Sequence, residues 1–113
     1  MKWLPLENET QLDELNEQSK TKPCIIFKHS IRCSISAMAK ARLDKEETLE
    51  AVDFYYLDLL AYRALSNRIA ELYQVKHESP QVLLIKNEAC AYEESHNGIR
   101  FDEIMEQVQH TQS

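Results

Sequence analysis

The stretch KPCIIFKHSIRCSISAMAKA, residues 22–41, contains the clearest strand and the clearest helix start of the chain. Residues 24–27 form a short apolar run, rich in β-branched and aromatic side chains and preceded by Pro23, which is typical of a buried strand. The next residues are polar or cationic, and from Ser34 onward good helix formers predict a helix. Cys33 is therefore expected at a strand-to-helix turn, at or beside the first helical residue.

Cys33 is the candidate nucleophile of this chain. The first turn of a helix has backbone N–H groups without intrahelical partners, and their partial positive charge favours a thiolate over a thiol. Lys28, His29 and Arg32 would add to this effect if their side chains turn toward the sulfur. The commoner fate of a free cysteine is burial as a small hydrophobic residue. The polar neighbours Arg32 and Ser34 argue against that alternative.

Residues 33–36, Cys-Ser-Ile-Ser, have the spacing of the thioredoxin-like Cys-x-x-Cys site with serine in place of the second cysteine, which is the monothiol form. Together with Lys-His-Ser at 28–30, this segment resembles the YtxJ-like family, the monothiol bacilliredoxins. Segments 65–71 and 77–82 are similar to the helix and the proline-containing strand entry of the same family. The resemblance extends from residue 3 to about residue 108 and implies a thioredoxin-like α/β fold.

The resemblance also implies an activity. A monothiol bacilliredoxin is a glutaredoxin-like thiol–disulfide oxidoreductase that removes a low-molecular-weight thiol, bacillithiol, from S-thiolated proteins, here through Cys33. In such a fold Pro80 would be a cis-proline facing Cys33, and the backbone of Ser79 would pair with an extended substrate segment; a trans-proline at the start of a strand is the base expectation. No bound cofactor is expected, because bacillithiol or a similar thiol serves as co-substrate.

Four residues near the candidate nucleophile have expected roles and alternatives. Ser36 replaces the resolving cysteine, and its hydroxyl or backbone N–H is expected to hydrogen-bond the thiolate, unless it is an ordinary exposed serine. Arg32 is expected to contact an anionic substrate and His29 to act as a base, or both face solvent without a role. Ser34 is a further expected substrate contact, although related thioredoxins more often have glycine or proline there.

Composition restricts the class of protein. The 113 residues predict one domain, 1–113, large enough to bury well over half of the surface of its unfolded form. Three cysteines at irregular spacing predict free thiols in a reducing cytoplasm rather than a disulfide framework. Cys24 and Cys90 are not expected to have a redox role, and His77 and His96 are too scattered to form a metal site with Cys33.

Charge and hydropathy exclude other partners. The net charge of −6 argues against nucleic acid, because phosphate binding needs a basic face. The N-terminus has no apolar signal core, and no stretch of about 18 apolar residues predicts a membrane span, so the protein is expected to be soluble and unexported. The basic residues beside Cys33 would favour a negatively charged thiol substrate.

The chain predicts a β-α-β-α-β-α-β-β-α order with a mixed central sheet flanked by helices. Strand-helix alternation predicts parallel pairing with right-handed crossovers, and a turn at Asn87-Glu88 predicts one antiparallel hairpin at the sheet edge. Strands are expected at 2–6, 24–28, 52–57, 81–86 and 89–93, and helices at 10–20, 34–50, 62–73 and 101–108, followed by a frayed tail at 110–113.

Two other functions remain open at this point. A non-catalytic interaction module of the same fold would hold a peptide on the Pro80 surface, with Cys33 only redox-modifiable. A peroxide sensor or peroxidase would oxidise Cys33 to a sulfenic acid, although no obvious resolving cysteine is present. The reactivity of the Cys33 thiol toward disulfides and toward peroxide distinguishes the three.

Overall fold

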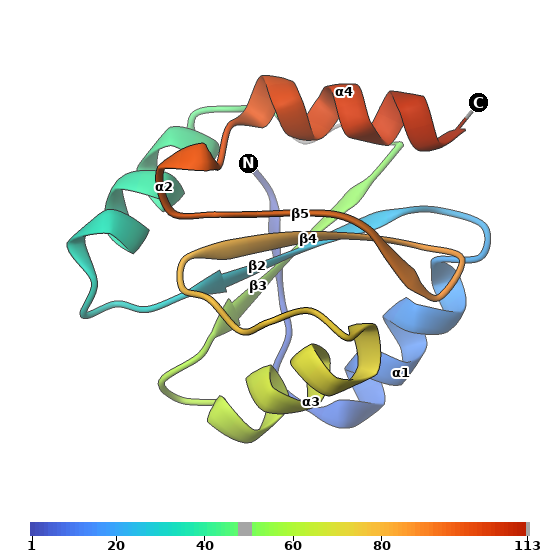
Figure 1. Ribbon diagram of the computed structural model, residues 1–113, viewed down its shortest axis with the longest axis horizontal. Helices are drawn as coiled ribbons and strands as arrows, with labels where there is room; N and C mark the ends of the chain where they lie inside the picture. The colour runs from blue at the N-terminus through green and yellow to red at the C-terminus, as the bar shows by residue number, and fades with distance from the viewer. Residues whose placement is uncertain (48–50, 113) are drawn as a thin grey trace.

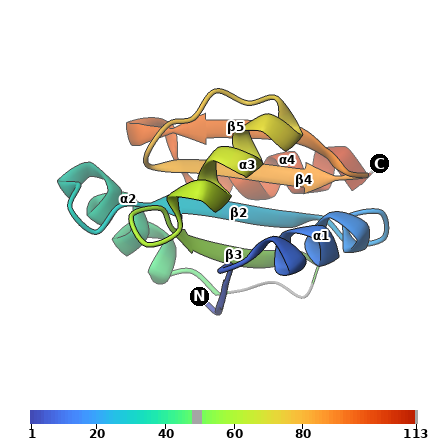
Figure 2. The same cartoon turned by 90° about the horizontal axis from the view of Figure 1, so that it is seen from below.

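The computed structural model describes residues 1–47 and 51–112 of the chain. Its strands form one mixed five-stranded sheet in the order β1-β3-β2-β4-β5. Helices α1 and α3 cover one face of the sheet, and α2 and α4 cover the other (Figures 1 and 2). The bounds are β1 Trp3–Pro5, α1 Glu9–Gln18, β2 Cys24–His29, α2 Ser34–Asp44, β3 Asp53–Asp58, α3 Arg63–Tyr73, β4 Gln81–Lys86, β5 Ala89–Ser95, a 3-10 turn His96–Gly98, and α4 Phe101–Gln112.

Strand β2 is the centre of the sheet, and all six of its residues are buried. Because side chains alternate along a strand, β2 contributes to both layers of the core. Cys24 and Ile26 pack with α1 and α3, whereas Ile25 and Phe27 pack with α2 and α4. The two residues that follow continue this alternation, so Lys28 and His29 enter opposite layers.

Several helix boundaries differ from the sequence expectation, most clearly those of α1 and α2. Helix α1 begins before Thr10, because Asn8 is its N-cap and accepts a hydrogen bond from the Gln11 N–H at 2.9 Å. Helix α2 ends at Asp44, with Lys45 as its C-cap, and does not continue through the charged run that follows. The last predicted residues of that helix, 48–50, lie outside the described residues.

The C-terminal helix is longer than expected. Helix α4 continues to Gln112, so the residues from His110 to Gln112, expected as a frayed tail, are helical, and Ser113 lies outside the described residues. Ile104 and Val108 on this helix are buried against the sheet. Within the described residues, no helix combines the length and the apolar composition that a membrane crossing requires.

Strand direction was predicted only in part. Strands β1 and β2 run parallel to β3, and β4 and β5 form the expected antiparallel hairpin. Strand β4, however, is antiparallel to β2, with Lys28 opposite Gln81. The physical reason is the connection 74–80, which carries the chain back to the end of the sheet where β2 finishes. Residues 79–80 therefore lie at the same end of the sheet as the turn after β2.

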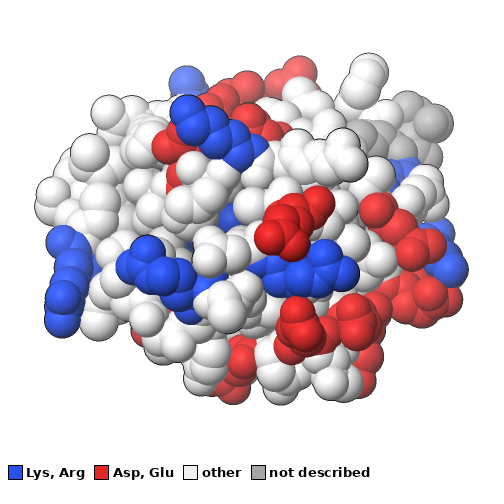
Figure 3. Space-filling model, turned by 60° about the horizontal axis from the view of Figure 1, so that its bottom comes forward, with Lys and Arg blue, Asp and Glu red and all other residues white. Residues whose placement is uncertain are grey.

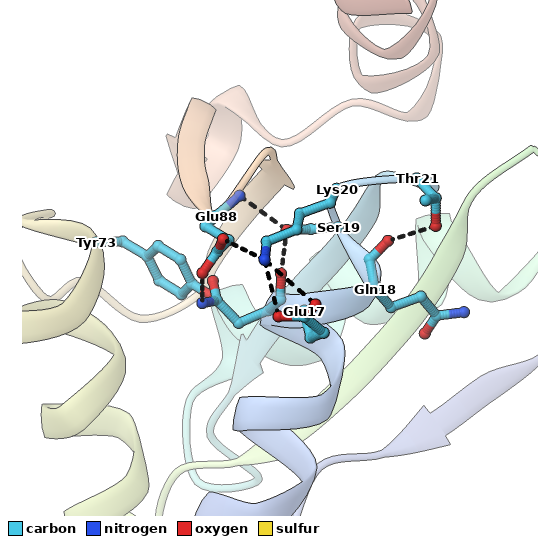
Figure 4. A network of polar contacts seen from close by, with 8 residues as sticks. Glu17, Gln18, Ser19, Lys20, Thr21, Tyr73 and Glu88 are labelled. Carbon is cyan, nitrogen blue, oxygen red and sulfur yellow. Dashed lines mark hydrogen bonds and ion pairs between the residues drawn. The ribbon is translucent and has the colours of Figure 1, made fainter.

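Polar contacts fasten the opposite end of the sheet (Figure 4). The hydroxyl of Ser19 accepts a hydrogen bond from the Glu88 N–H at 2.9 Å, and the Lys20 ammonium lies 3.1 Å from the Glu88 carboxylate. The Tyr73 hydroxyl donates to Asn16 Oδ1 at 2.8 Å. These contacts join α1, α3 and the β4–β5 turn away from the candidate site.

Candidate active site

Cys33 is the N-cap residue of helix α2, as the sequence predicted. Its backbone is extended, with φ −107° and ψ 120°, and its carbonyl accepts the first intrahelical hydrogen bond, from the Ala37 N–H at 3.0 Å. An N-cap side chain can accept hydrogen bonds from the N–H groups two and three residues later, here Ile35 and Ser36, but the Cys33 thiol makes no such bond in this structure. The Cys33 residue is partly exposed. Cys33 is therefore accessible to a substrate and lies beside the positive end of a helix.

The hydroxyl of Ser36 points into the protein. Ser36 is fully buried; its Oγ accepts a hydrogen bond from the Ser30 N–H at 3.0 Å and lies 2.6 Å from His29 Nδ1. Because Ser30 already donates to this oxygen, the hydroxyl hydrogen is free to donate to the histidine. The alternative of an ordinary exposed serine is thus wrong. The backbone N–H of Ser36 is the part that faces the helix N-terminus.

His29 is buried rather than solvent-facing, with 4% of its surface exposed. Its ring stacks on Phe27 at 5.8 Å between centroids and lies 5.6 Å from the ring of Tyr56. Burial, and then the nearby Lys40 ammonium, lower the pKa of His29, so the ring is neutral at pH 7. A neutral ring in this place holds Ser36 and thereby the first turn of α2.

The peptide bond between Ser79 and Pro80 is cis, as the family resemblance implied. Pro80 is buried, and its carbonyl accepts a hydrogen bond from the His96 N–H at 3.1 Å. Ser79 is partly buried, and within the described residues its hydroxyl has no hydrogen-bond partner. The antiparallel pairing of β4 with β2 places both residues at the end of the sheet that carries Cys33.

The surface around Cys33 combines one cation with exposed apolar side chains. Arg32 and Ser34, the two residues that flank Cys33, are exposed. Ile31, Ile35 and Met38 are large hydrophobic residues with 65%, 40% and 60% of their surface exposed. This turn therefore offers a partner an apolar surface beside a positive charge.

Comparison with known proteins decides the family. The family described as Monothiol bacilliredoxin BrxC matches residues 4–104, most of the chain. The chain belongs to this family. The resemblance read from residues 28–36 is confirmed.

Solved structures agree with this assignment and with the fold. A thioredoxin-fold protein described provisionally as an oxidoreductase superposes with a TM-score of 0.82 and 30% identity, covering 93% of this chain and 92% of that one. Thioredoxin f from spinach chloroplast gives a TM-score of 0.72 at 19% identity, with 99% and 95% covered. A thioredoxin from Malassezia sympodialis gives 0.75 at 12%, with 100% and 92% covered. The fold is the predicted thioredoxin-like α/β fold.

The other two cysteines of this bacilliredoxin family member lie in less reactive surroundings. Burial, with the nearby Asp53, raises the pKa of Cys24 to about 12. Burial also raises the pKa of Cys90, whose thiol donates to the Tyr92 carbonyl at 3.3 Å. All three cysteines are free thiols, and the described residues contain no group of three His, Cys, Asp or Glu side chains able to hold a metal ion.

Sequence reasoning missed one polar cluster next to the site. Lys28 is not the last residue of β2, which continues to His29. Its side chain is fully buried and lies within hydrogen-bond distance of Ser66 and His77. The signal was its place in the strand that leads to the turn before Cys33, a strand buried on both faces. Lysine is so often a surface residue that Lys28 was expected at the end of the strand, with a side chain able to turn toward Cys33.

Proposed function

We propose that this chain is a monothiol thiol–disulfide oxidoreductase that removes a low-molecular-weight thiol, bacillithiol, from S-thiolated proteins through Cys33. The observation that carries the proposal is an accessible thiol at the N-cap of α2, with buried Ser36 three residues later, in a monothiol bacilliredoxin family member. The thiol makes no capping bond in this structure; after ionisation, a small rotation of the side chain would let the thiolate accept from the backbone N–H groups of Ile35 and Ser36.

In the first step the Cys33 thiolate attacks the bacillithiol sulfur of the mixed disulfide on the substrate protein. A bond forms between Cys33 Sγ and that sulfur, the original S–S bond breaks, and its electron pair leaves on the protein thiolate, which takes a proton from water. No net oxidation or reduction occurs, because one disulfide replaces another. The substrate protein departs reduced, and Cys33 carries the small thiol.

The second step requires a thiol from outside. A dithiol site closes a ring onto its second cysteine, whereas Ser36 offers an oxygen already engaged by His29 and Ser30. A second bacillithiol, or the thiol of a partner reductase, attacks as thiolate the small-thiol sulfur bound to Cys33. With bacillithiol, the products are bacillithiol disulfide and the regenerated Cys33 thiolate.

Substrate binding is assigned to the two flanks of Cys33. On one side, the backbone of Ser79 before Pro80 pairs with an extended segment of the substrate protein, as a strand adds to a sheet edge. On the other side, Arg32 and Ser34 contact the small thiol. An anionic thiol fits this end of the molecule, since basic side chains without acidic neighbours lie toward the left edge of Figure 3, and acidic ones gather toward its lower right.

The reaction is proposed for the cytoplasm. Three free thiols, one of them partly exposed at a helix N-terminus, suit a reducing compartment better than an oxidising one. The partners are S-thiolated proteins and the small thiol itself.

The proposal is tested by following bacillithiol by mass. Purified protein is incubated with an S-bacillithiolated protein, and the mass of each species is recorded over time. We expect the modification to move to Cys33, Cys33→Ser to abolish transfer, and Cys24→Ser and Cys90→Ser to retain most of it. If the modification stays on the substrate while Cys33 is free, the proposal is wrong and the interaction module is favoured.

A further inference from the structure

Lys28 has a charge that the fold does not compensate. Its side chain is fully buried, and no carboxylate in the described part of the chain forms an ion pair with it. Burial lowers the pKa of Lys28 to about 8. Replacing a buried charge by an apolar side chain of similar volume is often stabilising. A lysine at this position therefore calls for an explanation other than stability.

The ammonium of Lys28 connects three elements. Its Nζ donates a hydrogen bond to the Ser66 carbonyl in α3 at 3.1 Å and lies 3.4 Å from His77 Nδ1. The Ser66 hydroxyl lies 3.3 Å from the same nitrogen of His77. His77 belongs to the segment 74–80 that leads to the cis-proline. Lys28 thus ties strand β2 and helix α3 to that segment.

Gln81 holds the same segment from strand β4. The buried Gln81 amide donates to the Lys76 carbonyl at 3.0 Å, and its oxygen accepts from the Glu78 N–H at 3.4 Å. Lys28 and Gln81 are direct partners in the β2–β4 ladder. Residues 76–78 are therefore held by the buried side chains of Lys28 and Gln81, which are neighbours on adjacent strands.

We propose that Lys28 is a positioning residue that, through His77, fixes the backbone of Ser79 and Pro80 for an extended protein segment. It thereby makes the site prefer bacillithiol on a protein over bacillithiol in a small disulfide. This inference rests on the proposed function.

The preference follows from what each substrate needs. A protein substrate lays a stretch of backbone along Ser79, so its binding depends on where the segment 76–80 is held. A small disulfide has no such stretch and meets only Cys33 and its immediate flanks. Loosening the segment should therefore weaken binding of the protein substrate and leave the sulfur chemistry unchanged.

The transfer experiment compares two substrates. One is a protein with a single bacillithiolated cysteine in an unstructured segment, and the other is the mixed disulfide of bacillithiol and cysteine. The variants are Lys28→Met and His77→Ala, with Lys86→Met at the far end of β4 and His110→Ala on α4 as matched controls. Rates are measured over a range of substrate concentrations to separate kcat from KM.

For both test variants we expect KM for the protein substrate to rise about tenfold, as for the loss of one hydrogen bond to a charged group. Their kcat, and their rates with the small disulfide, should stay within about twofold of wild type, a split that a general loss of structure would not produce. Equal losses on both substrates, or no loss on either, overturn the inference. A wild-type protein that transfers from neither substrate refutes the proposed function instead.

Hydrogen–deuterium exchange decides the positioning role without any substrate. The amides of residues 76–79 should exchange at least about fivefold faster in Lys28→Met and His77→Ala than in wild type, with the two controls unchanged. Unchanged exchange in this segment overturns the inference, whatever the transfer assay gives.

Discussion

Replacing Lys28 by methionine should stabilise the protein at pH 7. Burial lowers the pKa of this lysine from its usual 10.5 to about 8. This corresponds to about 3 kcal/mol against the charged form in the folded state, since each pKa unit is worth roughly 1.4 kcal/mol. Methionine is similar in length, flexible and uncharged, so it fills the same space without that cost.

Lost hydrogen bonds offset part of this gain. Methionine cannot donate to the carbonyl of buried Ser66 or to the exposed His77 ring, and leaving a buried acceptor without a donor costs about 1–3 kcal/mol. The cost should lie at the low end, because the Ser66 hydroxyl still reaches His77. The free energy of unfolding should therefore rise by about 1–2 kcal/mol in Lys28→Met.

The assay is urea unfolding of both proteins between pH 7 and pH 9.5. Between about pH 8 and 10.5 the unfolded wild type keeps a proton on Lys28 that the folded protein has released, so the wild-type free energy of unfolding rises with pH in this window. The variant lacks this titration. The difference in free energy of unfolding between the variant and wild type should be largest at pH 7 and should approach zero near pH 9.5. The contributions of the other titrating groups are the same in both proteins and cancel in this difference.

Two results would refute this reasoning. One is a Lys28→Met variant less stable than wild type at pH 7, and the other is a stability difference that does not change with pH. Lys86→Met serves as the control, because this lysine lies at the other end of β4 and is only partly buried. It should change the free energy of unfolding by less than about 0.5 kcal/mol at each pH.

Three further predictions concern the residues around Cys33. Ser36→Ala leaves the His29 ring and the Ser30 N–H without their buried partner and should lower the free energy of unfolding, measured in urea, by about 2–4 kcal/mol. Ser34→Ala, at an exposed position, should have little effect; equal effects would contradict the structure. Iodoacetamide at pH 8 should label Cys33 long before Cys24, whose thiol has a pKa raised to about 12 by burial, and peptide mass spectrometry showing early labelling of Cys24 would count against its burial. Because burial lowers the pKa of His29, its NMR titration should have a midpoint below the usual 6.5. The contribution of neutral His29 to the free energy of unfolding should be complete above pH 6.5 and should decline as the pH falls toward that midpoint. A midpoint above 6.5 would mean that the ring is not buried as described.

The order of elements could be predicted because each has a local pattern. The apolar run 24–27 and the helix formers from Ser34 onward fix the strand-to-helix turn, and Asn87 and Glu88 take positive φ values of 53° and 64° in the expected hairpin turn. Strand direction is not a local property. The antiparallel placement of β4 depends on the route of residues 74–80 back across the molecule, which no short pattern encodes.

For the candidate site too, features set by local sequence were predictable and features set by distant parts of the chain were not. Cys33 and Pro80 were found from spacing and resemblance, because their roles depend on nearby backbone geometry. Lys28, His29 and Ser36 were named as candidates, but their burial and the contact between His29 and Ser36 were not predicted. These features depend on which strand becomes the centre of the sheet and on a turn that brings residues 29 and 36 together.

The buried Ser36 hydroxyl has a consequence for how often the molecule can work. Once Cys33 has accepted a bacillithiol as proposed, the Ser36 hydroxyl cannot displace it, so the occupied form persists until an external thiol attacks it. The turnover rate then depends on the concentration of that thiol. When the thiol is scarce, each molecule accepts one bacillithiol and turns over no further. In such conditions the fraction of occupied Cys33 would serve as a gauge of the cell's thiol reserve.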